Sequence, residues 1–357
     1  RFIFFYKFED FGQARNAVLR VATRHFPDVS HILFADADWR PDLATVDLSE
    51  VDLIHASFQI MLWDHSGHTT RLAKPLLRND SRLRFKYRVH EILDPTALEM
   101  DPSKTIGWEI RVVESDSSWH AEQHGHSRAA ERFAFDLKLL ELDYRDDPSD
   151  MRTLFYLGIT TYSYMESLVG KGKHETTSEL AALTTDGMFY FRRLIDLHLG
   201  QPGTQFVWGA LRWLAYGYQY FTSEVEEAER WYLECIAYDP TRVDCTISIS
   251  RLFLDNGDFD AAWEAAKEGL LHRPQVKHVL DYFYMYECFV PIQAAAVISK
   301  RVDAAMLGSD SLEAVLTLGS YLMRHHTNHC NHGVLVDSVE DIRELHSWFD
   351  NAADREG

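Results

Sequence analysis

The first part of the chain contains short apolar runs with the spacing of strands. An apolar run, Phe2–Tyr6, lies within a predicted strand over Phe2–Phe8, and a second run, Ile32–Phe34, precedes two aspartates. An extended segment covers Leu53–Trp63, and Leu83–Val89 alternates apolar with mostly charged positions, as in a strand with one buried face. These patterns predict an α/β region.

A helix is predicted between the first two apolar runs. Asp10 and Gln13 have the spacing of a capping box, which begins a helix. The predicted helix has one apolar face, formed by Ala14, Val18, Val21, Ala22 and His25. Strand, helix and strand in this order predict a βαβ unit, and therefore a parallel, Rossmann-like sheet.

After His126 every periodic segment to about residue 350 has helical spacing. Ala228 and Pro240 recur 34 residues later as Ala262 and Pro274, which is the tetratricopeptide period. The sequence therefore predicts an all-α repeat domain over residues 127–350, after an α/β domain over 1–126 and before a disordered tail over 351–357. A generic helical array with accidental matches is the alternative.

Further residues fit the same repeat. Gly257 and Phe259 match a turn glycine and an aromatic position, and Leu157-Gly158 matches the first helix of an earlier, interrupted repeat. The small residues let neighbouring helices approach closely. The polar segment Lys171–Ser178 is predicted to be an inserted loop.

Composition narrows the classes of function. The 357 residues are 46% hydrophobic and carry a formal net charge of −19, which is typical of a globular protein and argues against nucleic-acid binding. No apolar run is long enough for a membrane span. The four cysteines form no CxxC pair and require no oxidising compartment, so the sequence predicts a cytoplasmic protein.

Asp36 and Asp38 follow the second apolar run with one residue between them. Carboxylates at the end of a strand can hold a hard divalent cation, Mn²⁺ or Mg²⁺. A chance acidic triplet in a loop is the alternative, because such triplets are common.

Three motifs together resemble family 2 glycosyltransferases of the GT-A fold, in the subgroup with a tetratricopeptide-like tail. They are the helix start Asp10–Asn16, the pair Asp36-Ala-Asp38, and Arg78-Asn79 followed by Arg88–Glu91. The resemblance covers residues 1–126. It implies that the chain is truncated at its N-terminus, because a complete domain has a further nucleotide-binding segment before the second motif.

The resemblance implies roles for individual residues. Asp36 and Asp38 would hold the metal and through it the diphosphate of a UDP- or GDP-sugar, while Arg15, Asn16 and Arg88 would contact the donor. A solvated surface charge is the alternative for Arg15.

Glu91 would act as the catalytic base that accepts the proton of the acceptor hydroxyl in an inverting transfer. His90 would line the donor pocket, or it is a half-buried histidine bonded to the backbone. His120 resembles a third metal ligand, with a polar histidine-rich linker as the alternative. The histidines and the cysteine within His325–His332 lack a matching second ligand pair for zinc.

The resemblance implies a metal-dependent, hexosyltransferase-like enzyme that moves a sugar from a nucleotide-sugar to an unidentified acceptor hydroxyl. Its helical repeats would bind the acceptor, a protein partner or a second copy. The alternative is a non-catalytic tetratricopeptide-like scaffold whose α/β part performs no chemistry.

Overall fold

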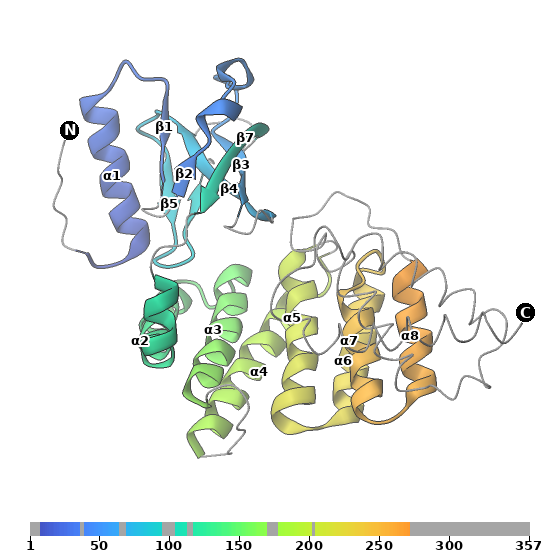
Figure 1. Ribbon diagram of the computed structural model, residues 1–357. Coiled ribbons are helices and arrows are strands. Elements are labelled where there is room, and N and C mark those ends of the chain that lie inside the picture. Colours follow the sequence, from blue (N-terminus) through green and yellow to red (C-terminus); the bar gives the residue numbers. More distant parts are fainter. Residues whose placement is uncertain are drawn as a thin grey trace, which may run out of the picture. The chain divides into compact units, whose positions relative to one another are not determined.

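The structure is a computed structural model that describes residues 8–35, 39–63, 69–94, 104–112, 117–169, 178–201 and 204–271. The chain divides into two compact units, Arg1–Leu197 (unit 1) and His198–Gly357 (unit 2), whose elements are labelled in Figure 1.

Unit 1 contains a five-stranded sheet with the order β1-β4-β3-β7-β2. The strands are β1 (His31–Leu33), β2 (Trp39–Pro41), β3 (Ser57–Trp63), β4 (Thr69–Arg78) and β7 (Lys104–Val112). All neighbours are antiparallel except β3 and β7. The predicted parallel βαβ sheet is therefore not shown, since β1 pairs only with β4 in the described residues. The predicted strand at Phe2–Phe8 lies almost wholly outside them.

Shorter elements complete this part of unit 1. Two 3₁₀ turns, η1 (Leu43–Thr45) and η2 (Leu48–Glu50), precede β3, and a separate antiparallel pair joins β5 (Arg84–Lys86) to β6 (Ile92–Asp94). The predicted strand over Leu83–Val89 is therefore shorter than its alternating pattern.

Helix α1 (Phe11–His25) begins at the predicted capping box. The Asp10 carboxylate accepts hydrogen bonds from the Gln13 backbone N–H at 2.7 Å and from its side-chain amide at 2.5 Å. The predicted buried face is wrong, because Val18 is 46% exposed whereas Leu19 is buried. Leu19 packs against Leu77 and Leu83, so the sheet and not helical periodicity alone selects the buried face of α1.

The two faces of the sheet have separate hydrophobic cores. Leu77 points toward α1, and its neighbour Leu76 joins the opposite core with Phe58, Ile60 and Trp108. Successive side chains of a strand point to opposite faces, so β4 contributes to both cores.

Three helices continue unit 1: α2 (Ser117–Asp146), α3 (Met151–Val169) and α4 (Ser178–His198). The predicted change to helix at residue 127 thus falls inside α2. Val89 packs with Leu139, Leu140 and Leu157, which ties the segment after β5 to α2 and α3. Most of the predicted loop Lys171–Ser178 lies outside the described residues, and α4 begins at its last residue.

Helices α3 and α4 pack through reciprocal glycine and aromatic contacts. Gly158 of α3 faces the ring of Phe191, and Gly187 of α4 faces the ring of Tyr162. The two rings lie 5.4 Å apart between centroids, and both residues are at most 1% exposed. Glycine is required here because a larger residue would collide with a buried ring.

Unit 2 consists of two helical pairs in its described part. The first pair is α5 (Gln205–Gly217), extended by the π-helical turn η4 (Tyr218–Thr222), and α6 (Val225–Tyr238). The second pair is α7 (Asp244–Asp255) and α8 (Phe259–Leu271), and Figure 1 shows the helices side by side.

The predicted 34-residue repeat is confirmed for these two pairs. Ala228 in α6 and Ala262 in α8 are both fully buried, so each lets a neighbouring helix approach. The turns also correspond, because Ser223 and Gly257 both have positive φ values, 58° and 79°, and lie 34 residues apart. Pro274 lies outside the described residues.

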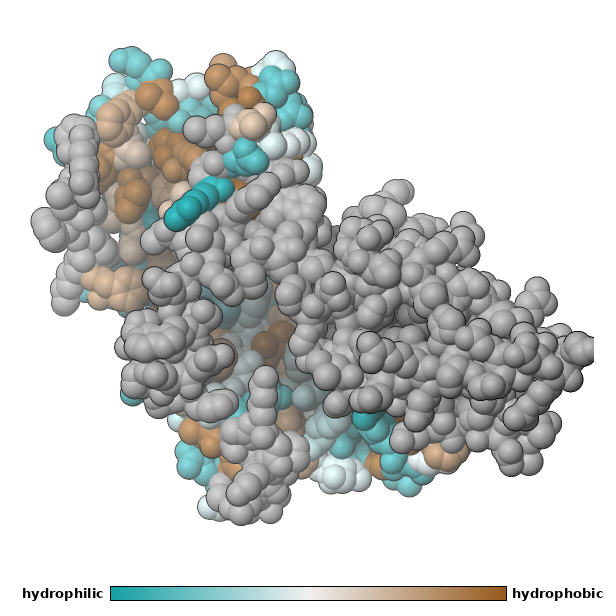
Figure 2. Space-filling view, in the orientation of Figure 1, coloured by the Kyte–Doolittle hydropathy of each residue, from teal (hydrophilic) through white to brown (hydrophobic). Residues whose placement is uncertain are grey.

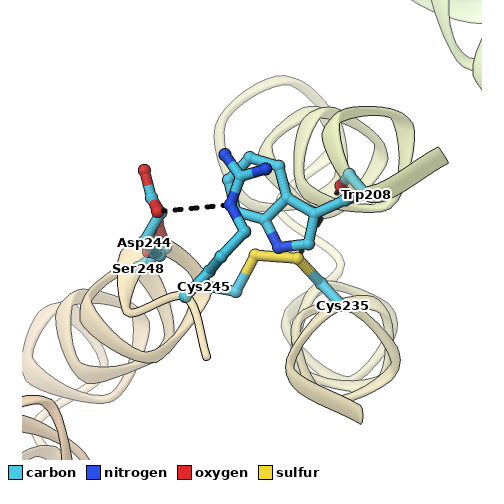
Figure 3. The surroundings of a disulfide bond; sticks show 6 residues. Trp208, Cys235, Asp244, Cys245 and Ser248 are labelled. Carbon is cyan, nitrogen blue, oxygen red and sulfur yellow. Dashed lines mark hydrogen bonds and ion pairs between the residues drawn. A yellow bond between two sulfur atoms is a disulfide. The ribbon is translucent and has the colours of Figure 1, made fainter. Parts of the chain in front are cut away.

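A disulfide joins the end of α6 to the start of α7, as Figure 3 shows. Cys235 and Cys245 are both fully buried and close a loop with a sequence separation of 10. The Arg242 guanidinium in this loop lies 3.2 Å from the ring centroid of Trp208 on α5. Sequence analysis did not predict this pairing, because the spacing of two isolated cysteines does not specify a partner.

Hydrophobic and hydrophilic side chains are interspersed on the visible surface over α1 and the sheet, as Figure 2 shows. The most exposed large hydrophobic residues of this part are Leu48, Ile54 and Leu53, at 74%, 62% and 58%. No helix within the described residues is long and apolar enough to cross a membrane.

Candidate functional site

Five of the predicted site residues of unit 1 lie in or contact the segment between β5 and β6: Arg15, Asn16, Arg88, His90 and Glu91. Tyr87 and His90 have positive φ values of 73° and 51°, which non-glycine residues adopt only at a cost. The start of α1 closes on this segment, because Phe11 donates its backbone N–H to the Arg88 carbonyl at 2.9 Å. Any side chain at Gly12 would collide with the carbonyl of Tyr87.

Asn16 and Arg15 connect α1 to the same region. The Asn16 side chain donates to the Phe85 carbonyl at 2.8 Å and accepts from its N–H at 2.7 Å, which replaces a neighbouring strand at this position. Arg15 forms an ion pair with Glu91. The structure therefore gives these three predicted site residues contacts that join α1 to the β5–β6 pair.

Arg88 joins the same segment to the end of α2. Its Nη1 donates to Asp143 at 2.6 Å and to Asp146 at 2.7 Å, and its backbone N–H donates to Asp143 at 3.0 Å. Arg88 was predicted to contact the nucleotide-sugar donor, and in the structure its guanidinium bridges two carboxylates.

His90 is stacked on an aromatic ring and bonded through its backbone. Its ring lies 4.1 Å from that of Tyr156, and its carbonyl accepts a hydrogen bond from Arg152 at 2.5 Å. Burial, together with the charges of Arg152 and Arg132, lowers the pKa of His90 to about 4. The imidazole is therefore neutral near pH 7.

An acidic cavity of about 340 Å³ lies beside these contacts, and we take it as the candidate functional site. It is bounded by the start of α1, the end of β5, the end of α2 and the start of α3. Its lining residues are Asp10, Gly12, Gln13, Asn16, Phe85, Lys86, Tyr87, Arg88, Asp143, Asp146, Asp147, Asp150 and Thr153. Five aspartates against one lysine and one arginine give the lining a formal charge of −3.

Three of the five carboxylates accept hydrogen bonds through both of their oxygens. Asp10 caps α1, and Asp143 binds Arg88. Asp150 accepts from the Tyr87 hydroxyl at 3.0 Å and caps α3 through Thr153 at 2.8 Å. These bonds fix the positions of the lining side chains.

Asp146 and Asp147 retain acceptor capacity. Asp146 accepts from Arg88 through Oδ2, and Asp147 accepts from Ser149 through Oδ1 and from the backbone N–H of Asp150. A carboxylate has about four acceptor positions, so each of the two can bind a further donor. The bonds from Ser149 lower the pKa of Asp147, and the charge of Lys86 lowers it further. The cavity thus presents fixed carboxylate oxygens suited to an ammonium or guanidinium group.

The predicted metal site cannot be placed. Asp36 and Asp38 lie outside the described residues, as does the side chain of His120, whose backbone is in α2. The His325–His332 cluster also lies outside them. Among the residues described, no group of three or more His, Cys, Asp or Glu is arranged to hold a metal ion. The Mn²⁺ or Mg²⁺ site therefore stays a prediction.

Two residues of the cavity lining, Asn16 and Arg88, were predicted to be site residues for a sugar donor, whereas the acidic wall of the cavity was not predicted. A signal was present, because Asp143, Asp146, Asp147 and Asp150 fall within eight residues around the α2–α3 turn. Such a run is ordinarily a solvated surface, and only the opposing β5 segment makes it one side of a cavity.

Comparisons with known proteins find no glycosyltransferase. No family model matches the chain, and no curated protein matches it. Similar solved structures include a MamA protein at 12% identity, with a TM-score of 0.38, 61% of this chain and 97% of that chain covered. BtubC from P. vanneervenii matches at 12% identity and a TM-score of 0.34, covering 64% and 89%. The structure of Naa15/Naa10 bound to HypK-THB matches at 17% identity with a TM-score of 0.21, and the match covers 62% of this chain and 41% of that chain.

These findings correct two predictions. The resemblance to family 2 glycosyltransferases is wrong, because no family model matches the chain and the described residues are mostly helical, with small sheets that do not show a GT-A domain. The prediction of a hexosyltransferase-like enzyme is wrong for the same reason. The described sheet agrees with the correction, because within the described residues β1 pairs only with β4, and antiparallel to it.

Proposed function

We propose that the chain is a non-catalytic helical-repeat scaffold that binds a protein partner, and that the acidic cavity receives a positively charged side chain of that partner. The observation that carries this proposal is the cavity itself, with a formal charge of −3 and fixed carboxylates on its wall. Complementary charge gives specificity and speeds encounter between proteins.

The residues that line the cavity favour a basic protein side chain over a metal ion as its ligand. The described carboxylates are not clustered as metal ligands, and the lining includes the aromatic rings of Phe85 and Tyr87. A long basic side chain has an apolar stem, which can pack on these rings, and a charged head, which can bind the carboxylates of Asp146 and Asp147.

The repeats of unit 2 support the scaffold assignment independently. Stacked helical pairs with buried small residues, such as Ala228 and Ala262, form extended surfaces that contact other proteins or a second copy of the chain. Light scattering of the purified protein would show whether a second copy of the chain binds.

Calorimetric titration with a short peptide of alternating arginine and glycine tests the proposal, with the glutamine-for-arginine peptide as the comparison ligand. We expect binding of the arginine peptide only, and weaker binding at high salt because exposed charges are screened. Asp146→Asn and Asp147→Asn should each weaken binding by about three- to tenfold, since each removes one attractive charge.

The matched control is Asp196→Asn, which removes an exposed carboxylate of α4 that does not line the cavity. This variant should bind as the wild type does. Equal binding of the arginine and glutamine peptides, or equal loss in all three variants, would refute the proposed site.

A further inference from the structure

Lys86 places a cation of the chain itself in the acidic cavity. It is the last residue of β5 and lines the cavity, and its Nζ lies 4.8 Å from the ring centroid of Tyr87. An ammonium at this distance from an aromatic face is attracted by it. The Tyr87 ring is held in place, because its hydroxyl donates to Asp150 at 3.0 Å.

The two basic residues of the cavity are held differently. The guanidinium of Arg88 bridges Asp143 and Asp146, and its backbone N–H is also bonded to Asp143. Lys86 is exposed, and no ion pair or hydrogen bond is found for its ammonium within the described part of the chain. Arg88 is therefore part of the wall, whereas the flexible stem of Lys86 lets its ammonium leave.

We propose that Lys86 is an internal competitor, whose ammonium occupies the place on Tyr87 and beside Asp147 that the cation of a protein partner takes. The inference rests on the proposed function, since it concerns the regulation of the same cavity. An incoming guanidinium displaces the Lys86 ammonium, stacks on the Tyr87 ring and binds the carboxylates of Asp146 and Asp147. Lys86 thereby sets the affinity of the site and disfavours weakly charged ligands.

The proposal predicts a gain of affinity, which damage to the fold does not produce. Lys86→Gln removes the charge and keeps an unbranched polar side chain, so the formal charge of the lining falls from −3 to −4. Removing one like charge roughly 6 Å from the ligand in a site open to water should tighten binding about three- to tenfold.

The experiment is calorimetric titration of the full chain with the arginine and glycine peptide at low salt. Lys86→Gln should bind about three- to tenfold more tightly than the wild type, by the Coulomb estimate for one charge. Lys86→Arg, which keeps the charge, should not bind more tightly. The matched control is Lys138→Gln, which removes an exposed charge of α2 that does not line the cavity and should leave affinity unchanged.

The outcomes separate the two proposals. If neither the wild type nor any variant binds the peptide, the proposed function fails and the role of Lys86 fails with it. If the wild type binds and Lys86→Gln binds equally or more weakly, only the role of Lys86 is overturned. An equal gain from Lys138→Gln would also overturn it, because the effect would then come from overall charge.

Discussion

The packing of α3 against α4 predicts an unusual effect on stability: at two helical positions, glycine should give a more stable protein than alanine. Alanine ordinarily stabilises a helix interior by about 1 kcal/mol relative to glycine. Gly158 and Gly187 are helical, yet each faces a buried ring of the other helix. We predict that Gly158→Ala and Gly187→Ala both destabilise the protein.

The structure gives the magnitude of the effect. A Cβ at position 158 would lie 2.5 Å from two ring atoms of Phe191, and one at position 187 would lie 2.6 Å from Cδ1 of Tyr162. Phe191 is fully buried and its ring contacts those of Tyr162 and Phe155, so a shift of the ring would disturb these contacts as well. Overpacking costs about 1–3 kcal/mol, which exceeds the gain in propensity and leaves a net loss of about 1 kcal/mol for each variant.

Urea denaturation followed by circular dichroism measures the free energy of unfolding of each variant. Gly200→Ala is the matched control, because nothing lies within 4 Å of a Cβ added there, and it should be neutral or slightly stabilising. Gly158→Ala combined with Phe191→Leu should lose less stability than the sum of the single changes, since the shorter side chain relieves the collision. A Gly158→Ala variant as stable as the wild type would show that α3 and α4 do not pack through this contact.

Three further predictions concern single features of the fold. Ser223→Gly should raise the free energy of unfolding by about 1 kcal/mol, because glycine adopts the positive φ of 58° at less cost than serine. Gly257→Ala should lower the free energy of unfolding by a similar amount, and urea denaturation midpoints measure both effects. Replacing Cys235 and Cys245 together by serine should cost about 3 kcal/mol, the entropy of closing a loop of this length, and an unchanged melting curve would contradict that. The pKa of His90 is about 4 in the folded protein against 6.5 in the unfolded chain, so between these pH values only the unfolded chain binds a proton at this residue. The free energy of unfolding should therefore fall by about 3 kcal/mol between pH 6.5 and pH 4, and His90→Asn should flatten this part of the pH profile.

The repeats could be predicted from the sequence because their signals are local. A helical pair fixes its own spacing, so Ala228 and Ala262 recur at the period of the fold, and Gly257 marks a turn that requires positive φ. The corresponding turn at Ser223 was not recognised, since serine is not the usual residue there. The capping box at Asp10 was equally local and is confirmed.

The sheet could not be predicted in the same way because strand pairing is not local. The alternation of apolar residues identified β5 approximately, but it contains no information on which strands become neighbours. The parallel pairing was assigned to the strand before Asp36, whereas the structure has its parallel pair between β3 and β7. The buried face of α1 was missed for a related reason, since the sheet beneath the helix selects Leu19 rather than Val18.

The motifs that suggested sugar transfer have a physical explanation in the joining of elements. Asn16 completes the hydrogen bonds of Phe85, and Gly12 lets the start of α1 approach the carbonyl of Tyr87. Arg15 pairs with Glu91 across the same contact. Residues with such specific partners form a recognisable pattern whether or not they perform chemistry, so the pattern alone does not identify a catalytic site.

The acidic wall has a different character, because its charge exceeds what the joining of elements requires. Arg88 needs one carboxylate partner to hold β5 against α2, and Asp143 already accepts from both its side chain and its backbone. Asp146 and Asp147 add two further negative charges to a chain whose formal net charge is −19, and mutual repulsion of that kind opposes folding. Asp146 and Asp147 do have partners in Arg88 and Ser149, but neutral residues could accept the same hydrogen bonds without that repulsion. The proposed cation of a partner would offset the surplus charge.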